Sequence, residues 1–125
     1  MEIISTKNAP KSIGPFSQAI VSGDHIYCSG QIALNPETME MIGKDVTEQI
    51  KQIFTNIQGV LKSCGLDLTN IIKTTVFLKD MGDFKEMNSV YEKMFGNHKP
   101  ARTTIEVSQL PLNALIEIEC IASIN

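Results

Sequence analysis

Residues 45–64 place apolar side chains at helical spacing. The apolar stripe consists of Val46, Ile50, Ile53, Ile57, Val60 or Leu61, and Cys64. Asp45 is placed to cap the first turn, and Glu48 to return a hydrogen bond to it. Gly65 follows and favours a left-handed helix stop. This segment is therefore the clearest predicted helix of the chain.

A second helix is predicted over residues 84–95, where apolar and polar positions repeat in the same way. Asp83 is its expected cap, Glu86 the reciprocal residue and Gly96 the stop. The helical apolar positions are Phe84, Met87, Val90, Tyr91, Met94 and Phe95.

The remaining regular segments are typical of strands, because they concentrate β-branched and aromatic residues between turn signals. The turn Ser22-Gly23-Asp24 predicts a hairpin, and Gly30 is expected to end its second arm. The element order predicts one α+β domain over residues 1–125, with two helices packed on one face of a mixed sheet. The predicted strands are 3–6, 17–21, 25–29, 70–79, 102–107 and 115–123.

The strand predicted at 70–79 has two partly apolar faces. Alternation puts Ile72, Thr74, Val76 and Leu78 on one face, and Ile71, Lys73, Thr75 and Phe77 on the other. Two helices cover only one face, and soluble monomers avoid large exposed apolar patches. The hypothesis is that the second face is buried against other copies of the chain in a closed ring.

The amino-acid composition limits the kinds of molecule that the chain is expected to bind. The 125 residues carry 11 basic and 14 acidic side chains, a formal net charge of -3, without a basic cluster. Binding to duplex nucleic acid depends on clustered Lys and Arg, and single strands favour aromatic platforms. The chain has no Trp and two Tyr, so its composition disfavours nucleic acid as a partner.

Cys28, Cys64 and Cys120 lie in apolar segments and are distant in sequence. They predict free thiols in a reducing compartment, with neither a disulfide framework nor a metal motif. Residues 1–5 lack the basic and apolar parts of a signal peptide, and no apolar run reaches membrane-spanning length. The expectation is a cytoplasmic protein with no membrane partner.

The candidate chemistry lies in the last two strands. After Pro100 the chain is extended, so Arg102 and Thr104 project from one strand face. Glu117 and Glu119 share a face of the last strand. If these strands share a pocket, the guanidinium would clamp a small carboxylic acid beside a proton acceptor. The alternatives are solvated surface charges, or a structural ion pair of Arg102 with Glu106 or Glu117.

Several segments together resemble the YjgF/YER057c/UK114 family, also called the RidA family of reactive imine deaminases. They keep the order and spacing of the family, and the combination is specific although no single segment is. The matching segments are Asn8-Ala9-Pro10, Ile13 to Ala19, Ser29 to Ile32, Asn35-Pro36, Ile72 to Asp80, Asp83-Phe84, Asn88, Tyr91, Pro100-Ala101-Arg102 and Ile116 to Glu119.

The resemblance implies a chorismate-mutase-like fold assembled as a homotrimer, with a closed inner barrel of sheets and sites in clefts between subunits. It also implies hydrolysis of short 2-imino acids, such as 2-iminobutanoate and 2-iminopropanoate, to 2-oxo acids and ammonia. The expected ligand is therefore a small 2-imino or 2-oxo acid. No cofactor is expected, since a protonated imine is already electrophilic at C2.

By this resemblance Arg102 binds the substrate carboxylate and Glu117 activates the attacking water. Ser29, Asn88, Thr104 and Phe16 would line the pocket, and the Gly30 backbone would approach the ligand closely. Strand periodicity alone does not separate Glu117 from Glu119. Asn88 could instead bond loop backbone, Ser29-Gly30 could be a turn, and Tyr91 could be core.

Phe16 departs from the commonest family pattern, in which active deaminases carry Tyr at this position. A missing hydrogen bond of this kind is worth about 0.5 to 1.5 kcal/mol, which predicts a weakened enzyme. Two other functions stay open: a regulatory module that binds a 2-oxo acid without catalysis, and a translation inhibitor that acts on RNA.

Overall fold

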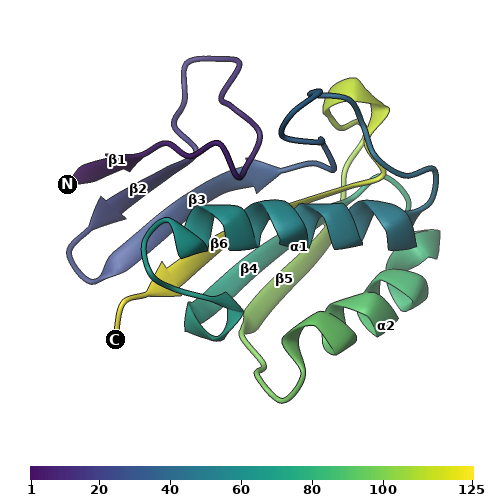
Figure 1. Cartoon of the computed structure of the whole chain (residues 1–125). Coiled ribbons are helices and arrows are strands. Elements are labelled where there is room, and N and C mark those ends of the chain that lie inside the picture. Colours follow the sequence, from purple (N-terminus) through teal and green to yellow (C-terminus); the bar gives the residue numbers. More distant parts are fainter.

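The chain folds as one six-stranded mixed sheet with two helices on one face (Figure 1). The computed structural model describes all of residues 1–125. The strand order is β1-β2-β3-β6-β4-β5; all neighbouring strands are antiparallel except β4 and β5. The α+β prediction is therefore confirmed. The strands are β1 Glu2–Ile4, β2 Ala19–Ser22, β3 His25–Gln31, β4 Ile71–Leu78, β5 Ala101–Glu106 and β6 Ile116–Ser123.

Helix α1 spans Val46–Lys62, and Asp45 caps it by accepting a hydrogen bond from the Glu48 backbone N–H at 2.8 Å. The reciprocal bond from the Glu48 side chain does not form. Gly65 has φ +75°, which confirms the predicted left-handed stop.

Helix α2 spans Phe84–Phe95, as predicted, and ends at Gly96 with φ +62°. The predicted side-chain cap is wrong, because Asp83 makes no capping hydrogen bond. A short 3₁₀ turn, Met81–Asp83, precedes the helix, and Asp80 caps that turn instead. Glu86 accepts a hydrogen bond from the Thr47 hydroxyl, which links the two helices.

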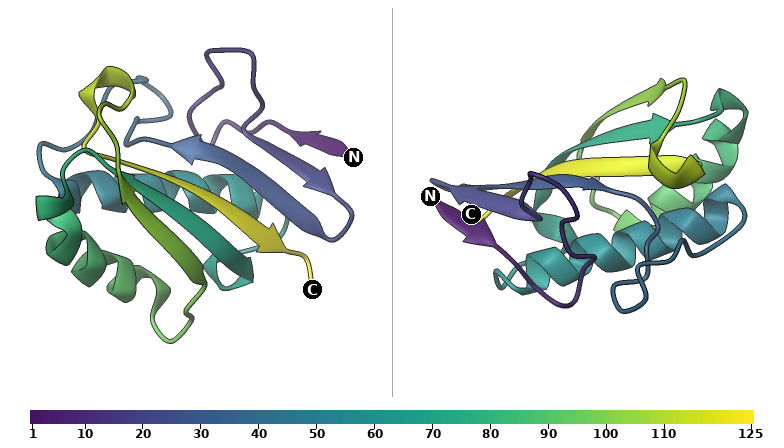
Figure 2. Two further views of the ribbon diagram at one scale, coloured as in Figure 1. Left: turned by 180° about the vertical axis from the view of Figure 1, so that it is seen from behind. Right: turned by 90° about the horizontal axis from the view of Figure 1, so that it is seen from above.

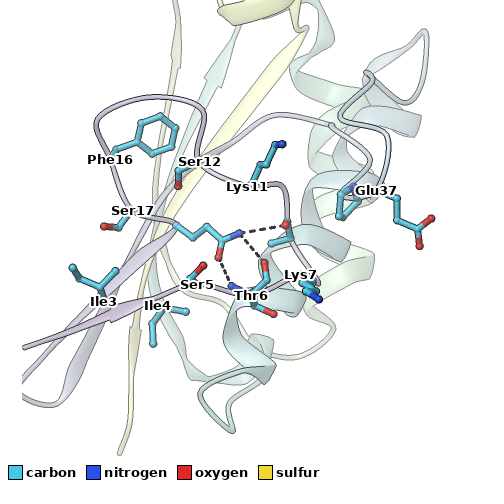
Figure 3. Close-up of a pocket in the computed structure, with 13 residues that line it drawn as sticks. Ile3, Ile4, Ser5, Thr6, Lys7, Lys11, Ser12, Phe16, Ser17 and Glu37 are labelled. Carbon is cyan, nitrogen blue, oxygen red and sulfur yellow. Dashed lines mark hydrogen bonds between the residues drawn. The ribbon is translucent and has the colours of Figure 1, made fainter.

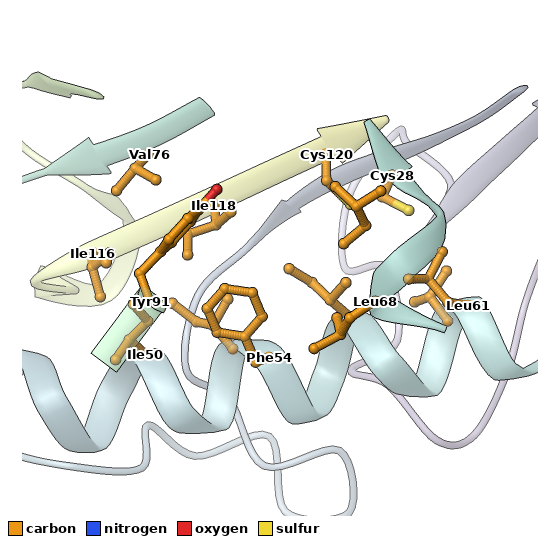
Figure 4. Close-up of a cluster of buried hydrophobic side chains, with 14 of the residues drawn as sticks. Cys28, Ile50, Phe54, Leu61, Leu68, Val76, Tyr91, Ile116, Ile118 and Cys120 are labelled. Atoms are coloured by element: carbon orange, nitrogen blue, oxygen red, sulfur yellow. The ribbon is translucent and has the colours of Figure 1, made fainter. Parts of the chain in front are cut away.

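The core lies between the helices and one sheet face (Figure 4). Phe54 of α1 packs edge-on against Tyr91 and Phe95 of α2, with ring centroids 5.8 and 5.3 Å apart. Cys28 and Cys120 are buried free thiols opposite each other on β3 and β6. Ile116, Ile118, Cys120 and Ala122 alternate with residues of the other face, so β6 presents its apolar side to the helices.

The second sheet face is uncovered (Figure 2, left). An irregularity between Ile71 and Lys73 interrupts the alternation of β4. Ile71 is therefore buried in the core, on the same side as Thr74 and Val76, while Ile72 is 43% exposed. The predicted placement of Ile72 on that side, with Ile71 on the opposite face, is wrong. Tyr27 is 48% exposed and Ile105 40% exposed. The structure thus has the exposed apolar side chains that motivated the hypothesis of a closed ring.

A second irregularity lies in β3. Cys28 pairs with Cys120, but the next pair is Gln31 with Ile118, so β3 has one extra residue at Ser29-Gly30. This β-bulge continues the strand to Gln31, and the prediction that Gly30 ends it is wrong.

Candidate functional site

Arg102 lies on the edge strand β5, on the face of the sheet that carries the helices. Its partner on β4 is Thr74, whose buried hydroxyl lies 2.7 Å from the Tyr91 hydroxyl of α2. The guanidinium carbon lies 4.8 Å from the centre of the Tyr91 ring and 5.6 Å from that of Phe84. This stacking orients the guanidinium without using its N–H donors.

The donors of Arg102 are free within the chain. The guanidinium forms no ion pair with Glu106 or Glu117, because Glu106 accepts the Met81 backbone N–H at 2.7 Å and Glu117 lies elsewhere. A cavity of about 350 Å³ opens beside Arg102, lined also by Asn88, Tyr91, Glu92, Phe95, His98, Lys99 and Pro100. We call this the Arg102 pocket. Arg102 and Lys99 on its wall outweigh the single acid Glu92, which favours an anionic ligand.

Glu117 lies on the central strand β6 and points to the uncovered face, opposite Phe77 of β4. It lines a different cavity, of about 600 Å³, which we call the Glu117 pocket. Burial raises the pKa of the Glu117 carboxyl above its ordinary value, and the charge of Glu119 raises it further. The walls are Pro10, Lys11, Ile13, Phe16, Ser29, Gly30, Gln31, Ile32, Leu34, Pro111, Leu112, Glu117 and Glu119.

Phe16, Ser29 and Gly30 line the Glu117 pocket, whereas Arg102 and Asn88 line the Arg102 pocket. Their expected contacts with one substrate stay a prediction. The Ser29 hydroxyl donates to the Ser17 carbonyl oxygen at 2.6 Å, which ties the bulge to the loop before β2. Phe16 stands on that loop with 54% of its surface exposed. The nearest group to the Gly30 side-chain position is the Glu117 carboxylate.

Gln18 anchors the loop that carries Phe16, a role that the sequence did not predict. The dashed lines beside Thr6 in Figure 3 mark hydrogen bonds of Gln18. Its buried amide accepts the Thr6 N–H at 2.7 Å and donates toward the carbonyl oxygens of Thr6, Ala9 and Pro10. A polar residue at the start of an apolar strand is a weak sequence signal for such an anchor.

Thr104 shares the strand face of Arg102, but it does not line the Arg102 pocket. Its hydroxyl oxygen is buried and has no hydrogen-bond partner. Its expected contact with substrate therefore stays a prediction, and the unpaired hydroxyl is a group that a neighbouring molecule could satisfy.

Arg102 and Glu117 lie on opposite faces of the sheet. Arg102 shares a row across the sheet with Thr74 and Cys120, on the helix side. Glu117 is three positions from Cys120, about 10 Å along β6, and β6 lies two strand spacings, about 10 Å, from β5. Within one chain Arg102 and Glu117 therefore face two separate pockets, and the condition that both strands share a pocket is not met.

Comparison with known proteins places this arrangement in a family. The sequence pattern described as Endoribonuclease L-PSP matches residues 6–124. The chain belongs to the YjgF/RidA family. It is 50% identical over 121 residues to a RutC family protein of Pyrococcus horikoshii, covering 97% of this chain and 96% of the relative.

Two further members of the YjgF/RidA family bear on function. Reactive Intermediate Deaminase A, chloroplastic, of Arabidopsis thaliana is 44% identical over 123 residues, which are 98% of this chain and 66% of the relative. The crystal structure of E. coli TdcF with bound serine superposes with a TM-score of 0.93 at 37% identity, covering 98% of both chains. The family thus includes a reactive intermediate deaminase and a member that binds a small amino acid.

Two further findings concern the whole chain. The structure contains no group of three or more His, Cys, Asp or Glu placed to hold a metal ion. Neither helix is long and apolar enough to cross a membrane.

Proposed function

We propose that this protein hydrolyses short 2-imino acids and their enamine tautomers, such as 2-iminobutanoate and 2-iminopropanoate, to 2-oxo acids and ammonia. The observation that carries the proposal is that Arg102 and Glu117 each face a cavity with no ion pair inside the chain. A structural role would pair these charges, whereas a binding role leaves them free. The similarity to a reactive intermediate deaminase supports the same reaction.

Each charge has one task in this reaction. The guanidinium group of Arg102 would hold the substrate carboxylate through two parallel N–H hydrogen bonds, which fixes both the position and the orientation of the substrate. Glu117 would take a proton from water as the water oxygen attacks C2 of the protonated imine, giving a neutral tetrahedral carbinolamine. Glu117 then returns the proton to nitrogen, the carbon–nitrogen bond breaks, and the oxygen stays on C2 as the carbonyl. The hydroxyl proton leaves with ammonia as ammonium.

The complete site would form between copies of the chain, in a homotrimer with an inner barrel built from the uncovered sheet faces. In this arrangement the Arg102 pocket of one copy meets the Glu117 pocket of its neighbour. The apolar side chains on the uncovered face support the assembly, because a monomer would expose them to water. Sedimentation should give a mass of about 41 kDa, three times the 13.8 kDa of one chain. A 13.8 kDa species at micromolar concentration would contradict the proposed homotrimer.

The remaining predicted residues divide between the two halves. Asn88 would contact the substrate from the Arg102 side, with Thr104 at the subunit boundary. Phe16, Ser29 and Gly30 would contact it from the Glu117 side. A cytoplasmic location remains the prediction from the sequence.

A coupled assay tests the activity. Threonine dehydratase generates 2-iminobutanoate in the presence of semicarbazide, which traps the imine. Adding the protein should accelerate 2-oxobutanoate release and reduce the trapped product, and the variant Glu117→Gln should not. If the unmodified protein leaves both products unchanged while still binding 2-oxobutanoate, the binding module is the better description. Binding of a small carboxylic acid without catalysis is the second candidate function, and the serine bound to the related TdcF favours it.

A further inference from the structure

The position of the Glu117 carboxylate is not set by hydrogen bonds. No donor or cation of the chain bonds it, and the influences on its pKa are burial and the charge of Glu119. A flexible glutamate without bonded partners keeps one geometry only where packing restricts it. The packing around this carboxylate therefore decides where a proton acceptor stands.

The packing partner is Gly30 of the neighbouring strand. A Cβ atom added to Gly30 would overlap Oε2 of Glu117 and lie 3.0 Å from its Cδ and 3.2 Å from its Cγ. The residue is not among the glycines with positive φ, so its backbone conformation suits any amino acid. The requirement for glycine here is thus one of space, and the occupant of that space is the Glu117 carboxylate.

The bulge in β3 creates this contact. Three steps along β3, from Cys28 to Gln31, correspond to two steps along β6, from Cys120 to Ile118. The extra residue moves the backbone of Ser29-Gly30 out of regular pairing beside Glu117, and bulges commonly re-aim a side chain in this way. The Ser29 hydroxyl bond to Ser17 at 2.6 Å fixes the bulge from outside the sheet.

We propose that Gly30 is a positioning residue: its bare Cα forms the surface on which the Glu117 carboxylate rests, in line for the attacking water. This proposal rests on the proposed function for its kinetic test, but not for its structural test. This task is additional to the proposed contact of the Gly30 backbone with the ligand, which Gly30→Ala would leave in place.

Gly30→Ala is the direct test. The methyl group would displace the end of the Glu117 side chain outward, and a misplacement of about 1 Å costs up to about 100-fold in rate. We expect kcat to fall about 10- to 100-fold with KM changed less than about threefold, since Arg102 still binds the carboxylate. Carbon-13 NMR titration of Glu117 should show its pKa lowered toward the ordinary value, because the displaced carboxyl gains water.

A shorter side chain should relieve the overlap. Glu117→Asp withdraws the carboxylate from the added methyl group, so Gly30→Ala should cost less than about twofold in kcat when introduced into the Glu117→Asp variant. This loss of the Gly30→Ala effect is specific to contact between the two residues, and independent structural damage would instead give additive effects.

Gly65→Ala is the matched control. Gly65 follows α1 with φ +75°, and a Cβ there would meet no atom within 4 Å, so the substitution strains the backbone without touching the Glu117 pocket. It should lower the melting temperature and leave kcat per folded protein unchanged. Gly30→Ala should lower kcat and leave the melting temperature nearly unchanged, because its clash meets the end of a flexible side chain.

The proposal is overturned if Gly30→Ala keeps both kcat and the Glu117 pKa, or if it raises KM alone. If the unmodified protein hydrolyses no imine, the proposed function fails, and the NMR titration alone then decides whether Gly30 positions Glu117.

Discussion

The Arg102 pocket and the Glu117 pocket differ in how they hold a charge. In the Arg102 pocket, a cation on an edge strand is stacked between aromatic rings of α2, with His98 and Lys99 nearby. In the Glu117 pocket, an anion on the central strand lies against a bare backbone, beside a second carboxylate and under apolar loop residues. Both charges lack partners within the chain.

This difference shows why the sheet separates them. An arginine and a glutamate on adjacent strands of one face would form an ion pair. That pair would occupy the N–H donors of the guanidinium and lower the pKa of the carboxyl. On opposite faces, the guanidinium donors stay open for an anionic ligand and the pKa of Glu117 stays raised. The separation keeps both side chains free of each other, and in the proposed assembly they would meet around a ligand.

The largest expected effects come from removing each charge in turn. Arg102→Ala should raise KM for 2-iminobutanoate about 100-fold or more, since it removes two charge-assisted hydrogen bonds. Glu117→Gln should lower kcat about 100- to 10,000-fold and leave 2-oxobutanoate binding intact. Calorimetry for binding and the semicarbazide assay for turnover measure the two separately. Equal loss of binding in both variants would contradict the division of tasks.

Mixing these two variants tests whether the halves come from different chains. Unfolding and reassembling equal amounts of Arg102→Ala and Glu117→Gln proteins should restore about a quarter of the original activity, because a quarter of mixed sites carry both native residues. Reassembly of each variant alone is the control. If both residues served one site from the same chain, the mixture would stay inactive.

Phe16→Tyr adds a hydroxyl on the side of the Glu117 pocket and leaves the Arg102 pocket unchanged. We expect kcat/KM to stay unchanged or to rise by up to about tenfold, the value of one gained hydrogen bond. Steady-state kinetics of the two proteins provide the comparison. A large fall would mean that the pocket has adapted to the unsubstituted ring.

Glu119→Gln should produce the smallest effect, a displacement of the pH profile. Glu117 must be ionised to accept a proton, so activity rises with pH through its pKa, which burial and Glu119 raise. Removing the neighbouring charge makes ionisation easier, so the acid limb of kcat/KM should move to lower pH. An unmoved limb would assign it to another group.

Much of the architecture was predictable from local patterns. Helix α2 begins and ends at the predicted residues, because a periodic apolar stripe and the Gly96 stop agree. Two of the errors lie at the β-bulges. In β4 the extra residue puts Ile71 rather than Ile72 on the core side, and in β3 it continues the strand past Gly30. No local signal marked either position. The capping role of Asp83 failed because a 3₁₀ turn before the helix already satisfied the local backbone.

The sequence by itself determined the elements, the apolar excess on both sheet faces, and the residues able to hold an acid and move a proton. Only the tertiary structure decided that Arg102 and Glu117 point away from each other and that Gly30 makes room for the carboxylate. The physical reason is that side-chain direction along a strand is local, whereas strand order, bulges and the space beside a side chain depend on neighbours distant in the chain.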